Sequence, residues 1–156
     1  MKKKYFALAA GLAAVDQALK ALVRLYPEGH VIWSFPPVVE FYRTTNTGAA
    51  FSILSSGTLL IVAVSTALMI ALCVLLARSA TKPRLFCVSL SGLIGGGIGN
   101  LMDRVIWGGV TDYIRLLFIR FPVFNFADIC ITASVAVLFI LICFDSKTDK
   151  PEEHHG

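Results

Sequence analysis

Four long apolar segments constrain this chain more than any other feature. They cover about residues 5–25, 58–77, 85–107 and 126–144. A hydrocarbon core about 30 Å thick is crossed by roughly 20 helical residues, so each segment can span a bilayer. The composition agrees, because 56% of the 156 residues are hydrophobic and only 15% are charged. We therefore expect an all-α integral membrane protein with four transmembrane helices, formed by a single membrane domain over residues 1–156.

The basic residues predict how these helices are oriented. They gather before the first span, between the second and third, and after the fourth, at Lys2, Lys3, Lys4, Arg78, Lys82, Arg84, Lys147 and Lys150. By the positive-inside rule, the connector 78–84 and the tail 145–156 are cytoplasmic, as are both termini, and loops 26–57 and 108–125 lie outside. The charges do not form the continuous stripe of a nucleic-acid groove, so no nucleic-acid partner is expected.

The first span has an alternative interpretation as a cleavable secretory signal, because it begins with a basic stretch and an alanine-rich run. The apolar pattern continues through "DQALKALVRL" without a small-x-small exit site, which favours a retained helix. The cysteines lie inside predicted spans at unrelated spacings, at Cys73, Cys87, Cys130 and Cys143. This placement is typical of small apolar fillers and predicts neither a disulfide framework nor a metal site.

Polar residues within the spans gather at their outer ends. They are Asp16, Lys20, Asn100, Asp103, Arg104, Asn125 and Asp128, with Asp112 just beyond the third span. A charge at the centre of a spanning helix costs at least about 2.5 kcal/mol on insertion scales, so such residues need partners or water. This layer is therefore the candidate functional site.

Spacing predicts how some of these charges are compensated. Asp16 and Lys20 are four residues apart on one helical face, which favours an internal pair that docks the first helix. Asp103 and Arg104 are adjacent and point about 100° apart, so each needs a partner elsewhere. For Arg104 we expect a backbone carbonyl or a carboxylate as acceptor.

The third span is rich in glycine, in the stretch "SGLIGGGIGNLMDR". Gly92 and Gly96 form one stripe with Asn100 and Arg104, and Gly95 and Gly99 form the neighbouring stripe with Asp103. Small residues at this spacing allow close helix packing. A dinucleotide-binding fingerprint is excluded, because no strand precedes these glycines and the last position of the motif is not glycine.

Asp112 and Asp128 flank the second outer loop. Asp112 follows two glycines that can end a helix and precedes a β-prone run through Phe121, and Asp128 opens the fourth helix with Asn125 as its N-cap. Helix-end stabilisation alone is an equally good explanation for Asp128. Two acids at one boundary can also share a proton, with one activating a water and the other polarising a carbonyl, as in an aspartic protease.

The first outer loop contains β-branched and aromatic residues around a turn at Pro36 and Pro37. We expect a small extracytoplasmic β-sheet here, followed by a short interfacial helix after Gly48. The aromatic residues of this loop could form either an aromatic belt in the headgroup layer or a substrate clamp. They are Trp33, Phe35, Phe41, Tyr42 and Phe51.

Two other functions compete with a protease, and a different type of aspartic protease is a third alternative. A small transporter or proton-relay subunit would place polar residues at all depths, whereas the inner halves of the second and fourth spans are almost purely apolar. A non-catalytic membrane scaffold would use the same charges as internal salt bridges. An intramembrane aspartic protease of the G-x-G-D type lacks its motif, since "GVTD" has no second glycine.

Five blocks resemble the lipoprotein signal peptidase family, also called signal peptidase II, in the same order along the chain. They are "DQALK", "NTGAAF", "GGGIGNLMDR", "GGVTDY" and "FPVFNFADI". The resemblance implies a four-helix aspartic endopeptidase of the bacterial inner membrane, with its active site at the outer leaflet. Such enzymes cut prolipoproteins before a cysteine that carries diacylglycerol.

The resemblance also implies roles for single residues. Asp112 and Asp128 match the family's catalytic pair. Substrate and inhibitor positions match Asn46, Gly48, Asn100, Arg104, Asn125 and Ala127, and supporting polar positions match Asp16, Lys20 and Asp103. Tyr113 departs from a phenylalanine that is common in the family. No cofactor is implied, the expected unit is a monomer, and the expected ligands are membrane lipid, the lipidated prolipoprotein and globomycin-type inhibitors.

Overall fold

The computed structural model describes residues 2–48, 57–79 and 81–145, and this part of the chain forms four helices and one sheet. The helices are α1 Lys3–Val23, α2 Gly57–Arg78, α3 Arg84–Trp107 and α4 Phe126–Asp145. Each contains a segment that is long and apolar enough to cross a membrane. The predicted fold of four transmembrane helices with a small sheet is confirmed, although α1 ends at Val23, before the predicted limit of residue 25.

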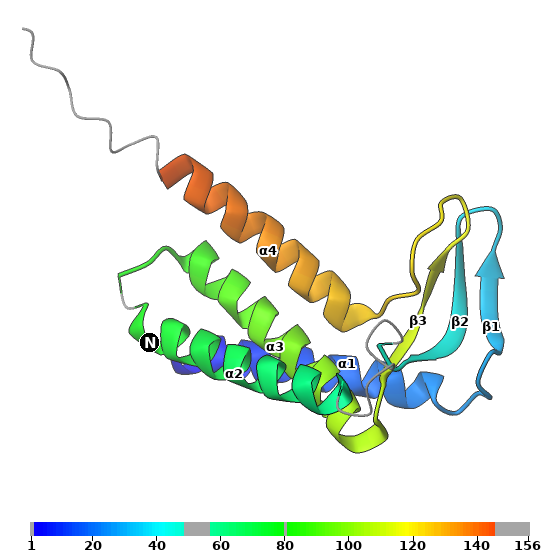
Figure 1. The fold of residues 1–156 in the computed structure, drawn as a ribbon. Coiled ribbons are helices and arrows are strands. Elements are labelled where there is room, and N and C mark those ends of the chain that lie inside the picture. The colour runs from blue at the N-terminus through cyan, green and yellow to red at the C-terminus, as the bar shows by residue number, and fades with distance from the viewer. Residues whose placement is uncertain (1, 49–56, 80, 146–156) are drawn as a thin grey trace, which may run out of the picture.

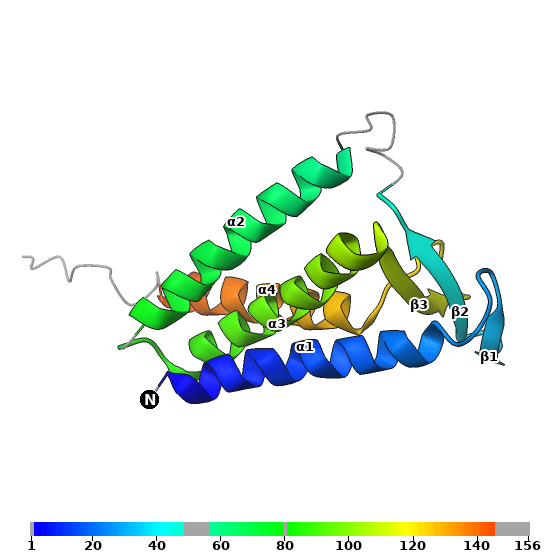
Figure 2. The same cartoon turned by 90° about the horizontal axis from the view of Figure 1, so that it is seen from below.

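Helix α3 lies at the centre of the bundle because its glycines admit neighbours on different faces. A Cβ atom on Gly96 would lie 2.5 Å from the backbone oxygen of Ala127 on α4. A Cβ atom on Gly95 would lie 2.7 Å from the backbone oxygen of Ala9 on α1. The two stripes therefore serve two different helices. Helix α2 also packs against α3 and diverges from it toward the sheet (Figure 2).

A three-stranded antiparallel sheet stands at one end of the bundle (Figure 1). Its strands are β1 Val31–Phe35, β2 Val39–Asn46 and β3 Val110–Leu116, in the order β1-β2-β3. The sheet combines both loops that were predicted to lie outside. The turn at Pro36 and Pro37 joins β1 to β2, as predicted.

Strand β3 is shorter than the β-prone sequence suggested. It ends at Leu116 and not at Phe121, because Ile114 exchanges backbone hydrogen bonds of 2.8 and 3.0 Å with Phe124 and the chain folds back. The predicted interfacial helix after Gly48 falls on residues 49–56, which lie outside the described residues, as does Phe51.

The start of β3 is fixed by the end of α3. Gly108 adopts a φ of +74° at the C-cap of α3, a left-handed conformation that glycine tolerates without steric cost. The chain then enters β3, whose register with β2 places Asp112 opposite Thr44 and Val110 opposite Asn46. The sheet thereby carries Asp112 and Asn46 to the first turn of α4.

Glycine packing gives a direct test of the bundle. Replacing Gly96 with alanine should lower the free energy of unfolding by about 1–3 kcal/mol, because the new methyl group meets the backbone of α4. A Cβ atom on Gly11 meets nothing within 4 Å, so Gly11→Ala should leave stability unchanged or raise it slightly. Reversible unfolding in mixed micelles would measure both, and equal stability of the two variants would contradict this packing.

Candidate active site

The first turn of α4 begins with a reciprocal cap. The backbone N–H of Asp128 donates to Oδ1 of Asn125 at 3.1 Å, and the backbone N–H of Asn125 donates to Oδ2 of Asp128 at 3.1 Å. This is the capping-box arrangement, which satisfies two N–H groups that a helix end leaves free. The cap fixes the direction of Asp128, and a negative charge is also favoured at a helix N-terminus.

The next two N–H groups of α4 are satisfied by other elements. The Phe126 N–H donates to the Tyr113 hydroxyl on β3 at 3.3 Å, and the Ala127 N–H donates to Oδ1 of Asp16 on α1 at 3.0 Å. Burial raises the pKa of Tyr113 to about 12, so the phenol stays neutral. All four leading N–H groups therefore have partners, which positions this helix end against α1 and β3.

Asparagine amides hold both carboxylates of the site. Asp112 accepts hydrogen bonds from the side-chain amides of Asn125 at 2.7 Å and Asn46 at 3.1 Å. Asp128 accepts one from the amide of Asn100 at 2.8 Å. Asn125 also donates to the Asn100 oxygen at 3.1 Å, and it is fully buried. The two acids are thus connected through a single asparagine, which contacts both.

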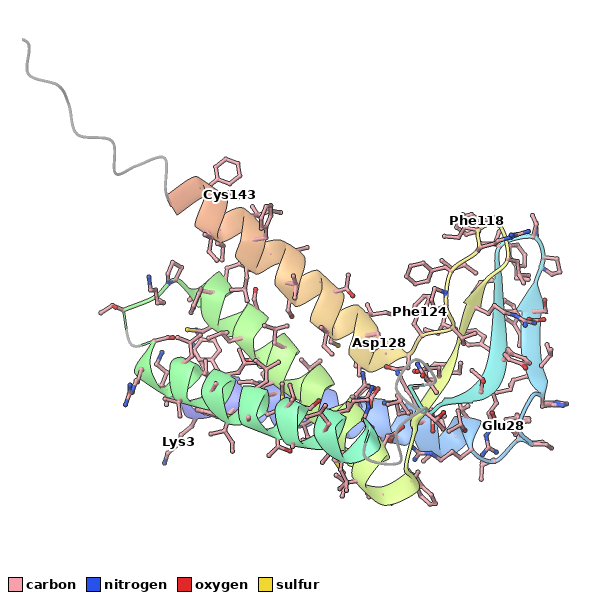
Figure 3. The ribbon with its side chains drawn as sticks, in the orientation of Figure 1. Lys3, Glu28, Phe118, Phe124, Asp128 and Cys143 are labelled. Atoms are coloured by element: carbon pink, nitrogen blue, oxygen red, sulfur yellow. The ribbon has the colours of Figure 1, made fainter. Side chains whose placement is uncertain are left out.

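A cavity of about 720 Å³ opens beside the two acids. Asp112, Asp128 and Asn46 supply its polar wall, and the other walls are mostly apolar, formed by Leu116, Phe121, Pro122, Val123, Phe124, Ile129, Thr132, Ala133 and Ala136. These residues come from β3, from the segment that follows it and from one face of α4. In Figure 3, Asp128 lies at the start of α4, on the side that faces the sheet, with Phe124 nearby. A largely apolar ligand with one polar group would fit these walls.

Burial changes the acidity of Asp112. Desolvation raises the pKa of its carboxyl to about 6, although the amides of Asn125 and Asn46 lower it; the charge of Asp128 raises it further. Near this pH the carboxyl can hold or release a proton. That property suits a group that must act as an acid.

The side chain of Lys20 is completely buried between acceptor groups. Its Nζ atom lies 2.8 Å from Oδ2 of Asp16, 2.8 Å from Oδ1 of Asn100 and 3.6 Å from Oδ2 of Asp103. The predicted pair of Asp16 and Lys20 is therefore present. Because Asp103 also accepts the N–H of Thr111 at 2.8 Å, the cluster connects α1 and α3 to the start of β3.

The four acids of the site differ in whether they form an ion pair with a cation. Asp16 pairs with Lys20, and Asp103 pairs with both Lys20 and Arg24. Neither Asp112 nor Asp128 forms an ion pair with any described residue. The first two acids can compensate the buried charges, whereas no ion pair with a described residue holds either acid at the cavity.

Within the described part of the chain, three other predicted site residues contact members of this site without a hydrogen bond to Asp112 or Asp128. Arg104 donates to the backbone oxygen of Asn100 at 3.2 Å, one of the two kinds of acceptor expected for it. Ala127 is fully buried between helices, and its backbone rather than its side chain contacts Asp16. Gly48 has a φ of +70° and donates its N–H to Oδ1 of Asn46 at 3.0 Å, so it orients that asparagine.

Two contributions were missed by the sequence analysis. Arg24, which was not among the predicted site residues, contacts Asp103 and donates to the Thr111 hydroxyl at 2.9 Å. Its spacing of four from Lys20 could have placed it on the same face of α1. The small residues of α4 that line the cavity, Thr132, Ala133 and Ala136, carried no distinguishing signal in an apolar segment. Within the described residues, no group of three or more His, Cys, Asp and Glu side chains could hold a metal.

The family model and the relatives that match this chain describe the same kind of protein. The family model described as signal peptidase (SPase) II matches residues 8–144. A lipoprotein signal peptidase of Brevibacillus brevis is 33% identical over 149 residues, covering 94% of this chain and 99% of that relative. A lipoprotein signal peptidase of Bacillus subtilis is 34% identical, covering 96% of this chain and 99% of the relative.

Solved structures show the same fold. A bacterial membrane enzyme determined by the in meso method at 2.3 Å resolution superposes with a TM-score of 0.84 and 28% identity. The match covers 96% of this chain and 93% of that one. A second structure, of a bacterial membrane enzyme at 1.9 Å resolution, has a TM-score of 0.82 with 28% identity and covers 89% of this chain and 92% of that one.

The buried ammonium group gives a prediction about stability. Replacing Lys20 with methionine should lower the free energy of unfolding by about 3–5 kcal/mol, because Asp16 loses its buried counter-ion. Lys3 is exposed near the start of the same helix, so Lys3→Met is the matched control and should change little. Unfolding titrations in mixed micelles would measure both, and wild-type stability of Lys20→Met would contradict a compensating role for this ammonium group.

Proposed function

This chain belongs to the signal peptidase II family, and from that membership we propose that it removes signal peptides from bacterial prolipoproteins. Its substrate is a prolipoprotein whose cysteine already carries diacylglycerol, and the bond before that cysteine is cut. Asp112 and Asp128 form the catalytic pair. The observation that carries this proposal is that both carboxylates line one cavity and are joined through Asn125.

The chemistry needs one proton shared between two acids. The ionised carboxylate takes a proton from a water as that water attacks the scissile carbonyl carbon, and the protonated carboxyl donates to the carbonyl oxygen. When the tetrahedral intermediate collapses, a proton returns to the leaving amine and the pair is restored. The pKa of about 6 for Asp112 supports its role as the group that holds the proton at rest.

The apolar walls of the cavity support a lipid-modified substrate. A diacylglyceryl group keeps its chains in the bilayer, so the bond beside it must be cut near membrane depth. The cavity extends from the two acids along Ile129, Thr132 and Ala136 on α4, where such chains can lie without entering water. Globomycin-type inhibitors would occupy the same cavity.

Orientation follows from the charge pattern. With both termini in the cytoplasm, the sheet and the two acids lie at the outer leaflet of the bacterial inner membrane. A single chain supplies all of the proposed catalytic machinery from its helices and its sheet, which supports action as a monomer. Asn46, Asn100 and Asn125 hold the acids in register. From the family resemblance, we assign Arg104 and Gly48 to contacts with the peptide backbone of the substrate.

Removal of either acid tests the proposed mechanism. Asp112→Asn and Asp128→Asn should each reduce kcat by roughly 10²- to 10⁴-fold, because the pair can no longer exchange a proton. The assay measures cleavage of a diacylglyceryl-modified prolipoprotein by purified protein in proteoliposomes. Unlipidated prolipoprotein is the substrate control and should not be cut.

Glu28 offers a matched control for the two acid variants, because it is exposed at the far side of the sheet. Glu28→Gln should retain activity. Substantial turnover by either Asp→Asn variant would rule out the paired mechanism. No cleavage of the lipidated substrate by the unmodified protein would rule out the proposed activity.

The pKa of Asp112 predicts a pH dependence. Its proton is held below about pH 6 and lost above it, so kcat/KM should fall as the pH rises through this value. Asn46→Ala removes an N–H donor that favours the charged form, so the pKa should rise and the falling limb should move to higher pH. Thr66→Ala, on the exposed side of α2, is the control. A shift of the limb to lower pH in Asn46→Ala would contradict the assignment.

A further inference from the structure

One end of the sheet is unusually apolar for an exposed surface. It is formed by the β1–β2 turn and by the segment after β3, which are tied together by the Leu117 N–H donating to the Val38 oxygen at 3.0 Å. We call this end the sheet tip, and it comprises Phe35, Val38, Leu117, Phe118, Ile119 and Phe121. Phe118 is 62% exposed and Phe35 is 57% exposed. An exposed apolar patch of this kind marks a site of interaction.

The opposite end of the sheet carries more polar groups, although Val31 is 41% exposed there. There the carboxylate of Glu28 accepts the backbone N–H of Thr45 at 2.7 Å and its hydroxyl at 2.9 Å, and Gly29 and His30 are exposed. Figure 3 shows Phe118 and Glu28 at opposite ends of the strands. The two ends of the sheet therefore differ in polarity.

The sheet tip lies beside the lipid-facing surface of the bundle. The strands run across the ends of the helices, and the tip extends to the side on which α4 lies (Figure 1). One face of α4 joins the tip through a continuous apolar wall, because Phe121 and Ile129 line the same cavity. Ile129 is itself 45% exposed. An apolar surface that continues from a spanning helix is expected to lie in the membrane interface and contact lipid.

We propose that the sheet tip is a membrane-insertion element, which enters the interfacial layer of the leaflet on its own side while the Glu28 end stays in water. The partner is the lipid surface itself. Arg120 is exposed between Ile119 and Phe121 of the tip, and its positive charge can meet lipid phosphate groups. This inference concerns the position of the sheet and does not depend on the proteolytic activity.

Insertion would place lipid directly at the cavity. Phe121 belongs to both the tip and the cavity wall, so acyl chains packed against the tip lie next to the opening. The tip would then hold the sheet against the membrane at the point where a lipid-modified ligand arrives. The delivery of a lipid-modified ligand to the cavity rests on the proposed function, whereas insertion of the tip does not depend on it.

Tryptophan fluorescence in proteoliposomes tests the insertion. Trp33 and Trp107 are first replaced with phenylalanine, and a single reporter is then introduced as Phe118→Trp at the tip or as His30→Trp at the polar end. The vesicles contain phosphatidylcholine with bromine atoms on one acyl chain, which quench tryptophan on contact. Circular dichroism verifies that both variants keep their helices.

The expected result is loss of Phe118→Trp emission in brominated vesicles and a shift of that emission to shorter wavelength, with neither effect for His30→Trp. Acrylamide, a quencher dissolved in water, should act in the opposite order. If the Phe118→Trp reporter is quenched by acrylamide and not by brominated lipid, the tip lies in water and the proposal is wrong. Lack of quenching by both reagents would place the tip against a second copy of the chain, and equal lipid quenching of both reporters would mean that the whole sheet lies on the membrane. Either result would also overturn the proposal.

Discussion

The architecture depends on the compensation of one buried ammonium group. Lys20 is removed from water, so its charge must be met by acceptors from the surrounding helices. Asp16 and Asp103 do this, and each makes a second contact, to the backbone N–H of Ala127 at the start of α4 and to that of Thr111 in β3. A buried ion pair contributes little net stability compared with apolar packing, but a misplaced helix would leave a charge unpaired. The cluster therefore specifies the register of α1, α3, α4 and β3 together.

Much of this arrangement could be predicted from the sequence, for reasons that differ between elements. The four spans were readable because a bilayer demands about 20 consecutive apolar residues, and the pair of Asp16 and Lys20 was readable because it lies within one helix. The contact between Arg24 and Asp103 was not, because it depends on how α1 and α3 pack. The end of β3 at Leu116 was also missed, since backbone pairing with the returning Phe124 decides it rather than strand propensity.

The glycines of α3 connect this electrostatic core to helix packing. A Cβ atom on Gly99 would lie 2.4 Å from Oδ2 of Asp16, so the absence of a side chain there lets α1 bring Asp16 to its partners. Gly96 similarly allows the backbone of Ala127 to approach, and the N–H of Ala127 donates to Asp16. The glycine pattern, interpreted from the sequence as general close packing, thus makes room for specific polar contacts. Steric and electrostatic requirements meet in the same turns of α3.

The asparagine side chains around Asp112 and Asp128 have a consequence for any reaction cycle in which a proton is transferred between the two acids. An arginine partner would keep its acid permanently negative, and each transfer would then have to break an ion pair. An asparagine is electrically neutral and offers both donor and acceptor atoms, so it can stay in place whichever acid is charged. Asn125 contacts Asp112 through its side-chain amide and Asp128 through its backbone N–H, so it links the two acids without placing a positive charge beside either of them. The resting and reacting forms of the site can therefore share one geometry, with little reorganisation between them.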